Sequence, residues 1–306
     1  MRRRSFLIGS AALLAGAALR PPAFAAAPRN FASLPQGRIA YIDRGRGPVV
    51  LFLHGFPLSS FQWRDAISRL SDTRRCLAPD WMGLGRTEVA PGQSVTPSAQ
   101  ADMLAAFLDH LGVKEVDIVA NDSGGQAAQL FLTRYRSRVK SLLLTNCDTE
   151  IDSPPPAVLP IIELARAGIY PELYLEPWLN HKDEARASTG LGGMCFSNPA
   201  NPTDEALDEY LGPLVSSPER KALINRYALG LFPNPLAGIA DQLRECKLPT
   251  RIVWGMGDTI FSPKSPDYLA SLMPQATIRR LDKAKLFWPE EYPEIIVEEA
   301  RRLWAV

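Results

Sequence analysis

The stretch Val116-Asp117-Ile118-Val119-Ala120-Asn121-Asp122-Ser123-Gly124-Gly125-Gln126 decides the fold of this chain. An apolar run ends in an acidic residue, and two glycines then open an alanine-rich segment. This pattern predicts a strand that turns sharply into a helix, with Asp122 at the tip of the turn. Residues two places to either side of such a tip must be small because the backbone is crowded there, and Ala120 and Gly124 meet that requirement.

Three readings of this turn are possible. Asp122 is a carboxylate nucleophile in the first. Ser123 is the nucleophile in the second, which places Asn121 and Gly125 at the flanks, and Asn121 is bulkier than such a turn prefers. In the third, the turn is an ordinary one and Asp122 only caps the helix. The size of the flanking residues favours Asp122 as the nucleophile.

The N-terminal residues have the features of an export signal. Arg3-Arg4-Ser5-Phe6-Leu7 is followed by an apolar run to Leu19 and then by Ala23-Phe24-Ala25, whose small residues suit a signal peptidase. We therefore predict a twin-arginine-type signal peptide over residues 1–25 and a periplasmic or secreted protein. The apolar run is shorter than the about 20 residues that cross a bilayer, so no stable membrane span is expected after cleavage.

Composition limits the class of protein. The chain has 306 residues, of which 46% are hydrophobic and 22% charged, which suits a globular α/β protein with one core and an inserted subdomain. Loss of the four arginines of the leader leaves 30 basic and 33 acidic residues, so no basic surface for nucleic acid is expected. The sequence gives no sign of the oligomeric state.

No cofactor is expected, because no dinucleotide-binding motif and no metal-type cluster of ligands is present in the sequence. The four cysteines are widely spaced, and their spacing does not decide between free buried thiols and a disulfide.

The mature chain alternates strands with helices. Strands are expected at residues 38–43, 49–54, 75–79, 116–120, 139–144, 250–254 and 277–281, and helices at residues such as 98–111 and 125–135. The run Val49 to Leu53 is apolar on both faces, which is typical of a strand buried between helices in a parallel sheet. The expected fold is thus a doubly wound, mostly parallel sheet.

The alternation stops between residues 153 and 240. This segment opens with Pro154-Pro155-Pro156 and has helical periodicity without a convincing strand, so it is predicted to be a helical cap. The core would then consist of residues 26–152 and 241–306. The cap holds several aromatic side chains that line a pocket or pack the cap itself: Tyr170, Tyr174, Trp178, Phe196, Tyr210, Tyr227 and Phe232.

Five motifs in this order resemble the α/β-hydrolase fold, in its haloalkane dehalogenase and epoxide hydrolase branch. They are the turn at Asp122, the cap that follows the next strand, and the stretches His54-Gly55-Phe56-Pro57, Asp80-Trp81-Met82-Gly83-Leu84-Gly85-Arg86-Thr87 and Gly255-Met256-Gly257-Asp258. The resemblance covers nearly the whole mature chain. It implies that Asp122 attacks a saturated carbon and forms an ester with the substrate.

The resemblance also implies the roles of neighbouring residues. The backbone N–H groups of Phe56 and Ser123 would receive negative charge when the ester is hydrolysed. Gly55 would allow close approach of the loop, and His54 is expected to hold hydrogen bonds within the turn rather than to act as a base.

The same resemblance shows a departure at the general base. The family places a histidine after the last strand, oriented by a carboxylate for which Asp148 and Asp258 are the two candidates here. The matching stretch reads Ala284-Lys285-Leu286-Phe287-Trp288-Pro289-Glu290, so Leu286 stands where the histidine belongs. Leucine transfers no proton, and loss of a general base removes about two to four powers of ten in rate. Lys285, Asp148, Asp258 and, less readily, His181 are the other groups that could act on water.

Two more positions leave the substrate class open between haloalkanes and epoxides. Dehalogenases of this group carry a tryptophan after the nucleophile, where this chain has Ser123, and Phe56-Pro57 is more similar to epoxide hydrolases, in which two cap tyrosines donate protons to the epoxide oxygen. We expect a cofactor-free hydrolase acting on a small apolar haloalkane or epoxide. The alternatives are a ligand-binding protein without turnover and a lyase or isomerase that uses Asp122 without forming an ester.

Overall fold

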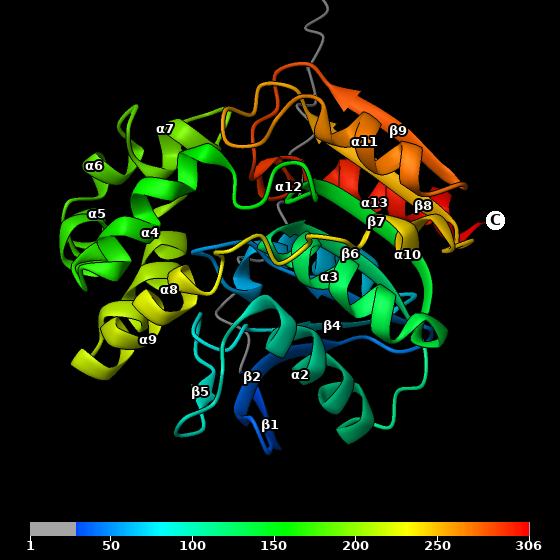
Figure 1. Ribbon diagram of the computed structural model, residues 1–306, viewed down its shortest axis with the longest axis horizontal. Coiled ribbons are helices and arrows are strands. Elements are labelled where there is room, and N and C mark those ends of the chain that lie inside the picture. The colour runs from blue at the N-terminus through cyan, green and yellow to red at the C-terminus, as the bar shows by residue number, and fades with distance from the viewer. Residues whose placement is uncertain (1–28, 306) are drawn as a thin grey trace, which may run out of the picture.

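A nine-stranded sheet forms the centre of the computed structural model, which describes residues 29–305 (Figure 1). The sheet order is β1-β2-β4-β3-β6-β7-β8-β9, and β5 pairs with β2. Pairs that involve β2 are antiparallel, whereas β4, β3, β6, β7, β8 and β9 run parallel to one another. The strands are β1 (Asn30–Leu34), β2 (Gly37–Arg44), β3 (Val49–Leu53), β4 (Arg75–Pro79), β5 (Glu88–Val89), β6 (Val116–Asp122), β7 (Val139–Cys147), β8 (Thr250–Gly255) and β9 (Ala276–Leu281). The expectation of a mostly parallel sheet is confirmed.

Two strands were not expected from the sequence. β1 pairs with β2 across a turn at Gly37, whose φ of 138° suits glycine. β5 has only two residues and is too short to give an alternating pattern. Asp122 therefore ends the sixth strand of the chain.

Helices cover both faces of the sheet. Val50 and Phe52 pack in one cluster with residues of α1 (Arg64–Leu70) and α13 (Pro293–Trp304), whereas Leu51 and Leu53 belong to the cluster of the opposite face. Successive side chains of a strand point to opposite faces, so a strand covered on both sides is apolar throughout. The remaining helices of the core are α2 (Pro97–His110), α3 (Ser123–Arg134), α10 (Ala240–Arg244), α11 (Ser265–Leu272) and α12 (Trp288–Glu291), with the short turns η1 (Ser60–Trp63) and η2 (Arg136–Arg138).

The chain between β7 and β8 is helical, and we call residues 153–240 the cap. Its helices gather at one end of the molecule, to the left in Figure 1. They are η3 (Pro156–Val158), α4 (Leu159–Arg166), η4 (Pro171–Leu175), α5 (Glu176–Asn180), α6 (Lys182–Arg186), α7 (Leu191–Cys195), α8 (Asp204–Val215) and α9 (Pro218–Leu229).

Three further expectations concern membrane-spanning helices, the cysteines and the N-terminal signal peptide. Within residues 29–305, no helix is both long and apolar enough to cross a membrane. All four cysteines are free and buried. The predicted signal peptide, residues 1–25, lies outside the described residues.

Candidate active site

Asp122 ends β6 at the carboxyl edge of the sheet, directly before α3. Its backbone has a φ of 54° and a ψ of −131°, and it is the one non-glycine residue with positive φ in the described part of the chain. Such a conformation costs about 1–3 kcal/mol and persists only where the surrounding structure enforces it. The sharp turn that the sequence predicts is therefore present, with Asp122 at its tip and Ser123 as the first residue of the helix.

The carboxylate of Asp122 is held by two backbone N–H groups. Phe56 N donates to Oδ1 at 2.8 Å, and Ser123 N donates to the same oxygen at 2.5 Å. Asp122 is 7% exposed and has no ion pair among the described residues. Burial raises the pKa of Asp122 to about 6, although the N–H groups of Phe56 and Ser123 and the Ser123 hydroxyl act in the opposite direction. The two N–H groups expected from the sequence thus meet at this carboxylate.

Two glycines allow the turn to pack this closely. A Cβ atom on Gly55 would lie 2.7 Å from the Cβ of Asp122, and one on Gly124 would lie 2.3 Å from the carbonyl oxygen of Leu53. Neither distance leaves room for a side chain. Gly55 and Gly124 are therefore part of the scaffold that brings Phe56 and Asp122 together, and Pro57 follows Phe56 through a cis peptide bond.

The candidate carboxylate Asp148 follows β7, the neighbour of β6, and the candidate Asp258 follows β8, the next strand of the sheet. Ser153 Oγ donates to Asp148 Oδ1 at 2.8 Å, and Gln126 Nε2 donates to the same atom at 3.1 Å. Burial, and then the charge of Asp122, raise the pKa of Asp148 well above its usual range.

Asp258 is held differently. Asn146 Nδ2 donates to its Oδ2 at 2.8 Å and Ile260 N donates to its Oδ1 at 2.8 Å. Burial raises the pKa of Asp258 to about 6, and the charge of Asp122 adds to this effect. Because both carboxylates interact with Asp122, the fold brings all three acids to one region, as expected of parallel strands that end at one edge.

Leu286 is 2% exposed and lies in the loop between β9 and α12. This loop is fastened to the cap by several hydrogen bonds. Phe287 N donates to the carbonyl oxygen of Cys195 at 2.9 Å, and Lys285 Nζ donates to that of Gly193 at 2.6 Å. Glu291 accepts from the N–H groups of Ser197 and Asn198, each at 2.8 Å. Lys285 is thus anchored on the cap backbone.

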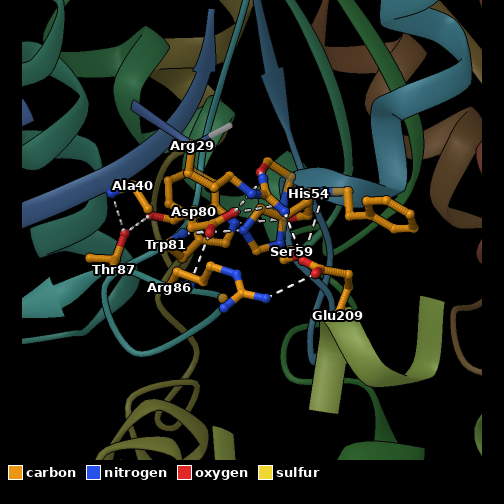
Figure 2. A network of polar contacts seen from close by, with 12 residues as sticks. Arg29, Ala40, His54, Ser59, Asp80, Trp81, Arg86, Thr87 and Glu209 are labelled. Atoms are coloured by element: carbon orange, nitrogen blue, oxygen red, sulfur yellow. Dashed lines mark hydrogen bonds and ion pairs between the residues drawn. The ribbon is translucent and has the colours of Figure 1, made fainter. Parts of the chain in front are cut away.

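None of the three histidines has a hydrogen bond to Asp122 within residues 29–305. His110 and His181 are exposed, the first at the end of α2 and the second between α5 and α6. His54 is fully buried, and burial lowers its pKa to about 4. Its Nε2 accepts from Trp81 N at 3.1 Å and its Nδ1 lies 2.9 Å from the Gly55 carbonyl oxygen, which fixes the proton on Nδ1 (Figure 2). His54 therefore holds the turn together, as the sequence suggested.

The cap is tied to the core beside this turn. Arg29 pairs with the buried carboxylate of Asp80 at an N–O distance of 3.7 Å and with Glu209 of α8 at 3.4 Å (Figure 2). Arg86 binds the same Glu209 at 2.8 Å. Asp80 in turn accepts from Ser60 N at 2.8 Å. The carboxylate of Asp80 therefore connects Arg29, which binds the cap residue Glu209, to the backbone of Ser60, which follows the loop of Phe56.

The structure separates the four candidate tyrosines. Tyr227 stacks on Phe56 with ring centroids 5.5 Å apart, and its hydroxyl donates to Ser123 Oγ at 3.2 Å. Tyr170 lies 6.0 Å from the same Phe56 ring. Tyr210 instead donates to Glu290 Oε2 at 2.7 Å, and Tyr174 packs edge-on against Trp178. Tyr170 and Tyr227 are therefore the two that lie beside the Asp122 turn. Phe196 packs on Phe287, and Phe232 is exposed.

Sequence reasoning missed two buried amides, Gln62 and Asn146. Gln62 is bonded to the turn at Asp122, and Asn146 to Asp258. The signal for Gln62 is its place between Phe61 and Trp63 in a buried segment, where a polar side chain needs a partner. No group of acidic, histidine or cysteine side chains suited to a metal ion occurs in residues 29–305.

Known proteins resemble this chain over most of its length. Residues 48–174 match the model of the family described as alpha/beta hydrolase fold. "Haloalkane dehalogenase 2" of Mycobacterium bovis is 28% identical over 85% of this chain and 89% of its own length. "Cis-3-alkyl-4-alkyloxetan-2-one decarboxylase" of Xanthomonas campestris is 25% identical over 92% of this chain and 96% of its own.

Among solved structures, the epoxide hydrolase CorEH covers 91% of this chain and 98% of its own, with a TM-score of 0.76 and 20% identity. The chain therefore has the α/β-hydrolase fold, and its sequence is similar to haloalkane dehalogenases of that fold.

Proposed function

We propose that the protein is an exported hydrolase in which Asp122 attacks a small apolar electrophile and forms a covalent ester. The observation that carries this proposal is the Asp122 carboxylate itself, strained at the tip of the turn and held by two N–H groups without a cation. Both N–H groups donate to Oδ1, so Oδ2 is the oxygen that attacks. The new C–O bond forms as the carbon–halogen or epoxide C–O bond breaks.

Hydrolysis of the ester would use the same N–H pair. Water adds to the carboxyl carbon of Asp122, and the negative charge collects on Oδ1 between Phe56 N and Ser123 N. The ester bond then breaks, which frees the alcohol and restores the carboxylate. With Leu286 at the position of the base, this second step would be slow, so the ester is expected to accumulate.

An epoxide is favoured over a haloalkane. An opening epoxide needs a proton on its oxygen, and the hydroxyls of Tyr170 and Tyr227 belong to rings that contact Phe56 beside Asp122. Burial raises the pKa of both hydroxyls, so each keeps its proton at neutral pH. A haloalkane is less favoured because Ser123 stands where the dehalogenases have a tryptophan, so the indole N–H that would bind the departing halide is missing at this position.

A lyase is the second candidate, and Leu286 favours it. The Xanthomonas campestris relative is named as a decarboxylase of oxetan-2-ones. Loss of CO2 from such a four-membered lactone leaves an alkene and consumes no water, because both ring-ester oxygens depart in the CO2. A site without a group that activates water is compatible with that reaction.

One experiment in H2¹⁸O separates these functions. A single turnover of a terminal epoxide by the hydrolase should give a diol and place ¹⁸O in the Asp122 peptide, because water attacks the carboxyl carbon. Conversion of an oxetan-2-one to an alkene without ¹⁸O in that peptide would support the lyase. An ester that persists without product would mean a stalled enzyme, and neither ester nor product would contradict the proposal in favour of a binding protein.

Export needs its own test, because residues 1–25 carry it. Replacement of both Arg3 and Arg4 by lysine should keep the protein in the cytoplasm of a bacterial host, whereas the unchanged chain should reach the periplasm. Equal periplasmic amounts of the two would contradict the twin-arginine prediction.

A further inference from the structure

Two buried amide side chains, Gln62 of η1 and Asn121 of β6, connect the loop before Phe56 to the loop of Leu286. Gly55 N donates to Gln62 Oε1 at 3.0 Å, and Gln62 Nε2 donates to Asn121 Oδ1 at 2.6 Å. Asn121 Nδ2 donates to the carbonyl oxygen of Leu286 at 3.1 Å and to that of Asn146 at 3.1 Å. Both amides are at most 1% exposed.

The orientation of both amides is fixed by their partners. The side chain of Asn121 faces two backbone carbonyl oxygens, which only accept hydrogen bonds. Its Nδ2 must therefore face these carbonyls, and its Oδ1 must face Gln62. Gln62 then donates with Nε2 and accepts from Gly55 N with Oε1. Every polar atom of the two side chains has a partner, and reversing either amide would leave a buried donor facing a donor.

Gly55 is the residue whose freedom this arrangement removes. Glycine has the widest choice of backbone conformations, and Gly55 directly precedes the N–H of Phe56. Its carbonyl oxygen accepts from Leu58 N at 2.9 Å and lies 2.9 Å from His54 Nδ1. Its N–H has Gln62 as its partner. The peptide on each side of Gly55 is thus anchored, and Gln62 supplies the anchor on the N-terminal side.

We infer that Gln62 and Asn121 form a positioning relay, which sets the Phe56 N–H against Asp122 and couples it to the backbone at residue 286. This inference rests on the proposed role of Asp122 and the Phe56 N–H in ester chemistry. Neither amide touches the reacting carboxylate, and each acts through the backbone that it holds.

Breaking the hydrogen bonds of the relay should raise the pKa of the Asp122 carboxyl group. If Gly55 is released, the Phe56 N–H moves away from Oδ1, and the carboxylate loses a donor that stabilises its charged form. Gln62→Met removes both hydrogen bonds with little change in length. Gln62→Asn, one methylene shorter, is the milder variant for use where Gln62→Met does not fold. Asn121→Leu cuts the relay at its other end.

Gln100→Met is the matched control. Gln100 is also a buried amide that bridges backbone segments, accepting from Met82 N at 3.1 Å and donating to the carbonyl oxygens of Met82 at 2.8 Å and Val95 at 3.2 Å. Its loss should cost a similar amount of stability without touching Gly55 or Asp122.

The test is a pH titration of the Asp122 carboxyl carbon by NMR in full-length protein labelled with ¹³C at aspartate, with Asp122→Asn used to assign the signal. The relay predicts that Gln62→Met and Asn121→Leu each raise the midpoint by about one pH unit, a tenfold change in protonation constant. The double variant should shift it no further than either single variant, because both break one chain of bonds.

An unchanged midpoint in the Gln62 and Asn121 variants, additive shifts in the double variant, or an equal shift in Gln100→Met would each overturn the relay. The titration needs no substrate. A failure of ester formation would therefore contradict the proposed function and leave this result standing on its own.

Discussion

Phe56 N lies 2.8 Å from Asp122 Oδ1, so the carboxylate that we propose as the nucleophile rests among the donors that would later stabilise charge on it. When Oδ2 forms the ester, Oδ1 becomes the ester carbonyl oxygen and is already in place. Donors that are oriented before the reaction need no reorganisation when charge develops, which is the main source of electrostatic catalysis. With Leu286 at the position expected for the base, the proposed hydrolase still needs a group that activates water.

Replacement of Leu286 by histidine should supply that group. The backbone at residue 286 is fixed by its hydrogen bond to Asn121. Asn121 also binds the backbone of Asn146, whose side chain binds Asp258, so Asp258 is the carboxylate that we expect to orient the imidazole. We expect ester breakdown to accelerate by about 100- to 10,000-fold, as measured by rapid quench and mass spectrometry. Leu286→Met is the control and should leave the rate unchanged. No acceleration in Leu286→His, with the fold intact, would mean that residue 286 does not face the ester.

Stability should depend on pH through Asp258. Its pKa is raised from 3.8 to about 6 by burial, so the folded protein holds this proton more tightly than the unfolded chain. The resulting stabilisation is complete below about pH 4 and is lost as the pH rises through about 6. Relative to the wild type, Asp258→Asn should therefore gain up to about 3 kcal/mol in unfolding free energy between pH 4 and 7.5.

Urea unfolding at both pH values measures this gain, with the exposed Asp241→Asn as control. A difference between Asp258→Asn and wild type that is the same at both pH values would show that Asp258 titrates normally.

Arg29 should contribute more to stability than a typical surface arginine. It forms an ion pair with the fully buried Asp80, and its loss leaves that carboxylate with its hydrogen bonds from Ser60 and Arg86 (Figure 2). We expect Arg29→Ala to lower the unfolding free energy by about 2–4 kcal/mol. Arg38→Ala, which breaks an exposed pair with Glu88 at 2.7 Å, should cost less than about 1 kcal/mol. If Arg29→Ala and Arg38→Ala lowered the unfolding free energy equally, the ion pair of Arg29 with Asp80 would not be buried in solution.

Gly124→Ala tests the packing of the turn. Its Cβ would lie 2.3 Å from the Leu53 carbonyl oxygen and 2.8 Å from that of His54, and neither backbone atom can move freely. We expect loss of ester formation and a destabilisation of at least about 2 kcal/mol. Gly212→Ala, in α8 with open space around it, should instead stabilise the protein by about 0.5–1 kcal/mol. Full activity in Gly124→Ala would contradict the observed contact.

The turn at Asp122 could be predicted because its geometry restricts residue size at fixed positions, and Ala120 and Gly124 record that restriction in the sequence. The parallel strands could be predicted because burial on both faces makes them continuously apolar. The placement of Asp148 and Asp258 near Asp122 follows from strands that end at one edge of the sheet.

The contacts of polar side chains could not be predicted. The place of Gln62 between Phe61 and Trp63 indicates burial, but it does not identify the partner, because Asn121 is 59 residues away. The sequence also could not predict which cap tyrosines lie beside Asp122, because this depends on how the cap packs over Phe56. β1 was missed because Phe31 and Leu34 alone give too short an apolar pattern beside a proline-containing segment.

The most direct test of the account is the mass of the peptide that carries Asp122 after brief incubation with terminal epoxides and haloalkanes. The account predicts a mass increase equal to the bound substrate portion in the wild type, localised to Asp122 by fragmentation and absent from Asp122→Asn. An adduct on Ser123 instead, an adduct that survives Asp122→Asn, or no adduct with any member of the panel would contradict the claim that Asp122 is a nucleophile.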